Sequence, residues 1–204
     1  MNRRNFITTT TLATAGALLT HSAFAAHDGK VGTLDIAEWT KINTEAGAKL
    51  KAIKPSSDKL SESDQKLMIE IAAGGMMQLE LSKAAVAKAT SADVKAYAQA
   101  EVDEQTGLAA KLKEIAMAKG ATLPETPDDK IKKAVEKLNA KSGADFDHAY
   151  LEQSGVEGHE KLDKTMSKVQ SKAQDATLKE VATTALPLIK THLQAARDEI
   201  KDKG

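Results

Sequence analysis

Helical periodicity runs through almost the whole chain, and no segment of useful length alternates between apolar and polar residues with a period of two. Apolar stripes at helical spacing predict four long helices, over residues 63–89, 91–119, 145–171 and 175–204. Short turns within each successive pair favour two antiparallel hairpins. Two such hairpins joined by a longer connector form a four-helix bundle, so the sequence predicts an all-α fold.

Two shorter helical segments accompany this bundle. An amphipathic stretch over residues 34–53 ends before Pro55, and we expect it to pack on the outside of the main domain as an N-terminal helical extension. Asp128 and Asp129 begin a short connector helix between the two hairpins. The predicted organisation is a cleaved signal peptide over residues 1–25, the extension with one helix over 26–60, and the helical bundle over 61–204.

The first residues resemble an export signal. Arg3 and Arg4 precede a weakly apolar run, and Ala23 and Ala25 supply the small residues of a cleavage site. The apolar run is too short and too rich in threonine to span a membrane. An ordinary secretory signal and a twin-arginine signal both fit this pattern. We therefore expect cleavage after Ala25, a periplasmic location and no transmembrane segment in the mature protein.

The composition excludes several classes of protein. The 29 basic residues balance the 29 acidic ones, which argues against a nucleic-acid-binding protein with a basic face. The chain has no cysteine, so its stability outside the cytoplasm must come from a packed core instead of disulfides. No nucleophile lies with a base at convincing positions, and no glycine-rich loop joins a strand to a helix. These absences favour a protein without enzymatic activity.

Four polar residues lie near the middle of the four long apolar stripes: Gln78, Gln105, His159 and His192. The helical rise places all four near the mid-height of the bundle, so we expect them to meet there. Buried polar groups must be satisfied, and a neutral hydrogen-bond network among the two glutamines and two histidines achieves this without an ion. The alternative is a metal site formed by His159, His192 and Glu101.

The acidic residues around Glu101 are expected to differ in exposure. Only Glu101 lies on the apolar stripe of its helix, where it is either a metal ligand or a partly solvated carboxylate. Asp103 and Glu104 are expected on the solvated surface. Glu160, next to His159, is the other carboxylate that we expect near the histidines.

Several short motifs follow one another along the bundle: Gly74-Gly75 before a polar residue at 78, Glu104-Gln105-Thr106, Leu123-Pro124, Phe146-Asp147 with Tyr150 and Gln153, His159-Glu160, and Leu186-Pro187 with His192. Together they resemble a family of exported bacterial proteins with a ferritin-like domain of unknown function, whose members carry periplasmic or outer-membrane labels. The resemblance extends from about residue 64 to residue 196, and it implies a ferritin-like four-helix bundle.

The resemblance also bears on the site. The family pattern implies a glutamate at the position of Gln78 and an Asp-His pair at the positions of Glu104 and Gln105, whereas His159 and His192 match. Ferritin-like metal sites take carboxylates and imidazoles from four helices. Glutamine in place of either group removes a ligand that iron or manganese prefers, which favours the neutral network.

We therefore expect a non-enzymatic bundle protein of the cell envelope, without a cofactor, for which the family labels imply a role in stress tolerance and association with the envelope. The alternative is a metal-binding or redox-active ferritin-like protein that holds a transition metal through His159, His192 and Glu101.

Overall fold

The computed structural model describes residues 29–203, so the predicted signal peptide lies outside the described residues. The described chain is mostly helical, which confirms the all-α prediction, and none of its helices is both long and apolar enough to cross a membrane. Its elements follow in the order β1 (Lys30–Val31), β2 (Leu34–Asp35), α1 (Ile36–Ala52), α2 (Glu62–Lys88), α3 (Ala92–Lys119), α4 (Asp129–Asn139), α5 (Gly143–Tyr150), the π-helix η1 (Leu151–Val156), α6 (Glu157–Lys172) and α7 (Ala176–Lys203).

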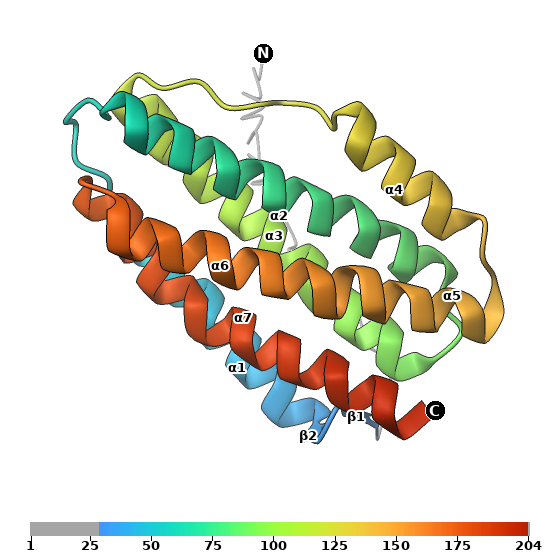
Figure 1. Cartoon of the computed structure of the whole chain (residues 1–204). Coiled ribbons are helices and arrows are strands. Elements are labelled where there is room, and N and C mark those ends of the chain that lie inside the picture. The colour runs from blue at the N-terminus through green and yellow to red at the C-terminus, as the bar shows by residue number, and fades with distance from the viewer. Residues whose placement is uncertain (1–28, 204) are drawn as a thin grey trace, which may run out of the picture.

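The long helices pack in two pairs (Figure 1). α2 lies against α3, α6 lies against α7, and contacts between α2 and α6 join the pairs. α1 packs against α3 and α7, and the short α4 lies along α2. The predicted extension helix and connector helix are therefore both present. The small β1–β2 hairpin before α1 was not predicted, because strands of two residues leave no periodic pattern.

Helix ends follow from local chemistry. Ser61 and Asp128 begin α2 and α4, where each side chain accepts a hydrogen bond from a backbone N–H in the first turn. Gly120 ends α3 in the left-handed conformation, with φ 65°, which glycine adopts without steric cost.

Two buried aspartates tie the helix pairs together at opposite ends. Asp147 on α5 accepts hydrogen bonds from the backbone N–H groups of Thr90 and Ser91 in the α2–α3 turn. Asp64 on α2 accepts hydrogen bonds from those of Gln174 and Asp175 in the α6–α7 turn. Carboxylates are favourable at helix N-termini because they satisfy free N–H groups and lie at the positive end of the helix dipole. Each hairpin turn is therefore held by a side chain of the other pair.

The helix expected over residues 145–171 is not regular. It passes from α5 through the π-helix η1 into α6, with no break in direction (Figure 1). A π-turn shifts the backbone hydrogen-bond pattern by one residue and occurs often at functional sites. Apolar periodicity does not reveal such a shift, because the flanking turns remain α-helical.

Candidate metal centre

A polar layer crosses the middle of the bundle. The apolar core consists of two clusters, one around Leu67, Leu112 and Ile189 and the other around Tyr97 and Phe146. Along each long helix the change from one cluster to the other falls where a polar side chain is buried. The fully or almost fully buried polar residues at this level include Gln78, Glu101, Gln105, His159 and His192.

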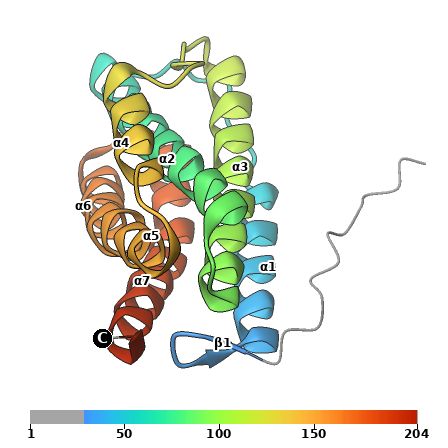
Figure 2. The same cartoon turned by 90° about the vertical axis from the view of Figure 1, so that its right-hand side faces the viewer.

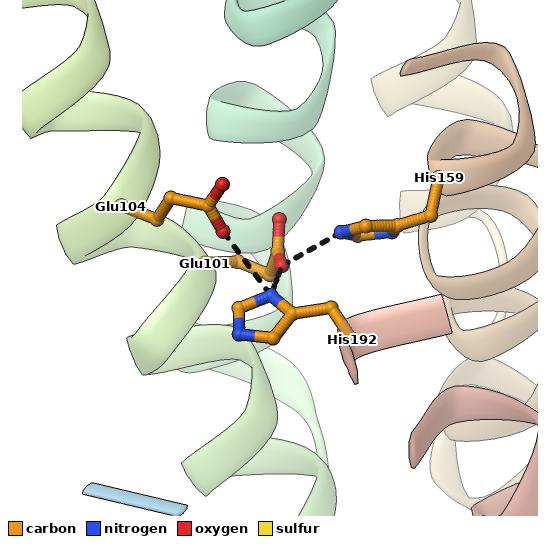
Figure 3. A group of neighbouring side chains, drawn as sticks. All are labelled: Glu101, Glu104, His159 and His192. Atoms are coloured by element: carbon orange, nitrogen blue, oxygen red, sulfur yellow. Dashed lines mark hydrogen bonds and ion pairs between the residues drawn. The ribbon is translucent and has the colours of Figure 1, made fainter. Parts of the chain in front are cut away.

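Two histidines converge on one carboxylate oxygen (Figure 3). Nε2 of His159, on α6, lies 2.9 Å from Oε1 of Glu101, on α3. Nδ1 of His192, on α7, contacts the same oxygen. All three side chains have no measurable exposure. Three different helices, α3, α6 and α7, thus place their polar groups around one point.

Glu104 completes the cluster from the same helix as Glu101. Its Oε2 lies 3.2 Å from Nδ1 of His192, at an ion-pair distance, and its side chain is only 8% exposed. Because an α-helix has about 3.6 residues per turn, Glu104 lies about 60° around the helix axis from Glu101 on one side. Gln105 lies about 40° from Glu101 on the other side. Because Glu104 turns toward α1 and α7, it reaches His192. The prediction that Glu104 lies on the solvated surface is therefore wrong, since α1 packs over this side of α3.

The π-helix orients His159. The backbone carbonyl of Ser154 in η1 lies 3.0 Å from Nδ1 of His159 and accepts a hydrogen bond of 2.8 Å from Nε2 of Gln78. A carbonyl only accepts, so the proton of the neutral imidazole belongs on Nδ1. Nε2 of His159, which faces Glu101, then carries the lone pair.

Asn43 orients His192 in the same way. Its amide nitrogen donates a hydrogen bond of 2.9 Å to the backbone carbonyl of Trp39, which fixes the orientation of the amide. Its Oδ1 therefore faces Nε2 of His192, at 2.8 Å. The proton of the neutral imidazole belongs on Nε2, and Nδ1 presents its lone pair to Glu101 and Glu104.

These tautomers leave the centre of the cluster without a proton. In the neutral state, two imidazole lone pairs and the carboxylate oxygens of Glu101 and Glu104 face one another at hydrogen-bond distance. Such contacts are repulsive unless a positive charge lies between them, either as protons on the histidines or as a metal ion. In metal sites, ligating histidines characteristically donate their second N–H to a carbonyl or carboxylate, as His159 and His192 do here.

Electrostatics show the same need for positive charge. Burial raises the pKa of Glu101, but the charges of His159 and His192 outweigh it and hold this pKa well below its usual range. Burial lowers the pKa of His159, yet the charge of Glu101 and its hydrogen bond together raise it to about 9. Burial raises the pKa of Glu104 to about 7, because His192 offsets it only in part. Without an ion, the cluster therefore holds protons at neutral pH.

The donor set fits a transition metal. One ligand atom from each of Glu101, Glu104, His159 and His192 lies within 4.8 Å of the others. Oε2 of Glu101 and Oε2 of Glu104 are buried and accept no hydrogen bond from the described residues. Two imidazoles with two carboxylates suit iron, manganese, cobalt or zinc, and oxygen atoms with free lone pairs are available to bind the ion.

The predicted network residues separate in the structure. Gln78 lies beside His159, with its Nε2 3.4 Å from Nδ1. Gln105, which we expected in the same network, has no hydrogen-bond partner among the described residues, and its Oε1 lies against Gly75. The expectation for Gln105 is therefore corrected. In the orientation of α3 that places Glu104 beside His192, Gln105 faces α2.

Two expectations about acidic residues are also corrected. Glu101 is fully buried, so it is not a partly solvated carboxylate. Glu160 lies at the surface in an ion pair with Arg197 and takes no part in the cluster.

The family model described as "Domain of unknown function (DUF4142)" matches residues 49–198. The chain belongs to the DUF4142 family. The matched region contains all four residues of the cluster, whereas Asn43 lies before it. Neither the curated proteins nor the solved structures gave a significant match to this DUF4142 chain.

Proposed function

We propose that this protein binds one transition-metal ion through Glu101, Glu104, His159 and His192. In this proposal the bundle has ferritin-like architecture and acts in the cell envelope. One observation supports this proposal most strongly: two imidazole lone pairs and two carboxylates meet at the centre of the cluster. Both histidine tautomers are set by hydrogen-bond acceptors on the far side of the rings, the carbonyl of Ser154 and Oδ1 of Asn43.

A neutral network of glutamines and histidines accounts for these contacts less well. Gln105 makes no hydrogen bond to either histidine. Gln78 meets His159 on the nitrogen that faces Ser154, away from Glu101. Neither amide therefore supplies a donor to the carboxylates at the centre of the cluster, and positive charge is still required there.

The surroundings of the cluster bear on what a bound ion can do. Iron or manganese held by this donor set supplies one-electron redox chemistry and a Lewis acid. A cavity of about 260 Å³ between α1, α3 and α7 is lined by Asn43 and Glu104. This cavity supports access of small molecules to the Glu104 side of the cluster, whereas apolar core closes the two ends along the bundle axis.

The proposed location rests on the sequence of the first residues. The segment over residues 1–25 has the features of an export signal, which supports a periplasmic protein. In this proposal the mature protein has an N-terminal extension followed by the bundle over residues 61–204. Of the two signal types, the twin-arginine type exports folded proteins and suits a metal loaded before export. The role in stress tolerance rests on family labels alone and stays a prediction.

Elemental analysis tests the proposal. The protein is purified from the periplasm without a histidine tag, and bound metals are quantified. We expect close to one transition-metal ion per chain, and almost none in a His159→Ala/His192→Ala double variant. The matched control is His148→Ala, since His148 is half-exposed on α5 and pairs with Glu152 away from the cluster. A metal-free wild-type protein that also fails to take up added metal would overturn the proposal.

A further inference from the structure

A second polar site lies on the other side of α3. A groove of about 660 Å³ runs between α2, α3 and the connector over residues 121–127; we call it the Gln105 groove. The connector crosses from the end of α3 to the start of α4 (Figure 2). Its walls are mostly apolar and include Met76, Leu79, Leu112, Met117, Leu123 and Pro124. Grooves of this size and composition are typical of small-molecule sites.

The floor of the groove carries an unpaired amide. Gln105 is 1% exposed, and neither its Nε2 nor its Oε1 makes a hydrogen bond to a described residue. Gly75 lies opposite, and a Cβ there would come within 2.9 Å of Oε1, so the absent side chain leaves room for the amide. A buried amide without partners is unfavourable, and a ligand that reaches it gains both a donor and an acceptor.

The rim of the groove indicates a neutral ligand. Two acidic residues, Glu80 and Glu125, and two basic residues, Lys83 and Lys113, line it. Glu80 and Lys83 pair with each other at 2.7 Å. Because the rim has no excess charge, an ion gains little from entering. The exposed side chain of Met117, at 76%, extends the apolar wall to the surface.

We propose that the Gln105 groove binds a neutral amphiphile with an apolar body and a polar head. The head, such as a carboxamide, carries a hydrogen-bond donor and a hydrogen-bond acceptor side by side. The head pairs with both amide atoms of Gln105, and the body lies between the methionine and leucine side chains. This site shares no residue with the metal cluster, so the two proposals stand independently.

Titration with octanamide tests the site. Methyl octanoate has a similar chain and accepts hydrogen bonds but donates none. The amide signals of Gln105, assigned by their loss in Gln105→Leu, are followed by NMR. We expect one equivalent of octanamide to shift them, and Gln105→Leu to weaken octanamide binding about tenfold, because two hydrogen bonds are lost. Methyl octanoate binding is expected to change less.

Two further variants make the test decisive. Gln99→Leu removes an amide on the same helix that donates to Asp103, and it should bind octanamide as wild type does. Met117→Asp places a charge at the exposed end of the apolar wall and should weaken both ligands, which keeps the test open if Gln105→Leu does not fold. If wild type binds no octanamide, or if folded Gln105→Leu binds it with wild-type affinity, the proposal is overturned. If Gln105→Leu does not fold, wild-type affinity in Met117→Asp overturns it instead.

Discussion

Oδ1 of Asn43 lies 2.8 Å from Nε2 of His192. Asn43 belongs to α1, outside the region that the family model matches, yet it fixes which nitrogen of a candidate ligand carries the lone pair. The extension helix is therefore part of the site as well as a cover for it. Removal of an acceptor of this kind characteristically lowers metal affinity without altering the ligands themselves.

The role of Asn43 can be tested by three substitutions. Asn43→Leu keeps a similar volume but removes the acceptor, and we expect metal affinity to fall by about 10- to 100-fold. Asn43→Asp restores an acceptor and should retain most of the affinity. Thr44→Val is the matched control, because Thr44 is exposed on the same helix and its hydroxyl donates to the backbone carbonyl of Thr40, away from His192. Competition with a chelator measures all three, and equal affinities across the set would refute the role of Asn43.

Glu101 should be the least replaceable ligand, since both histidines face its Oε1. Glu101→Gln keeps the shape but removes the charge, and its amide offers a donor where the histidines need a cation. We expect metal binding to weaken by at least about 100-fold, as loss of a buried charge partner costs about 3–5 kcal/mol.

Asp103→Asn is the matched control for Glu101→Gln. Asp103 is exposed two residues away on α3, so its charge is screened by water, and its variant should bind metal as wild type does. Equal losses of affinity in the two variants would show a nonspecific effect of charge and contradict the assignment.

Stability of the metal-free protein should fall as pH rises. The pKa of His159 is raised from 6.5 to about 9, so its stabilising contribution is complete below 6.5 and disappears as pH rises through 9. The pKa of Glu104 is raised from 4.5 to about 7, so its contribution disappears between those values. In each window the slope is at most about 1.4 kcal/mol per pH unit.

Urea unfolding between pH 6.5 and pH 9 measures this dependence in the metal-free protein and at saturating metal. Metal binding requires deprotonated ligands, so the metal-dependent gain in unfolding free energy should increase over the same range. A metal-free protein whose stability rises toward pH 9 would contradict the protonated cluster.

Trp39 should report on the metal. It is the only tryptophan in the sequence and stacks on the ring of His192, with centroids 4.6 Å apart and planes at 28°. A paramagnetic ion bound to Nδ1 of His192 lies close enough to quench its fluorescence, whereas zinc, with a filled d shell, should leave most of the emission. We expect one equivalent of copper or cobalt to remove most of the fluorescence, and His192→Ala to abolish the effect at equal metal concentration. Unchanged emission with bound copper would place the metal elsewhere.

Much of the fold followed from the sequence, because each long helix carries its own apolar stripe and its own end signals. Gly120 illustrates these signals, since it lies at the end of α3 in the structure. The π-helix did not follow, since the turn around Ser154 differs from α-helix in its hydrogen bonds and hardly at all in apolar spacing. Ferritin-like architecture and the boundary at residue 60 remain predictions.

The site was predicted in part. His159, His192 and Glu101 interrupt apolar stripes, and from that pattern we predicted that their side chains lie close together. Glu104 was missed because a single helix shows it on the polar side, and only the packing of α1 buries it. Asn43 was missed for the same reason. The position of Gln105 was predicted wrongly because the height of a residue along the bundle does not specify the side of the helix on which it lies. Gln105 follows Glu104 by one residue, and its side chain lies toward α2 in the Gln105 groove, whereas Glu104 reaches His192.

Anomalous X-ray diffraction from crystals of the metal-loaded protein, recorded at the absorption edge of the bound element, tests the central claim most directly. We predict one strong peak per chain, within about 2.0–2.2 Å of His159 Nε2, His192 Nδ1 and carboxylate oxygens of Glu101 and Glu104. No peak at this position in a protein that carries stoichiometric metal, or a peak bound only by surface residues, would contradict the account.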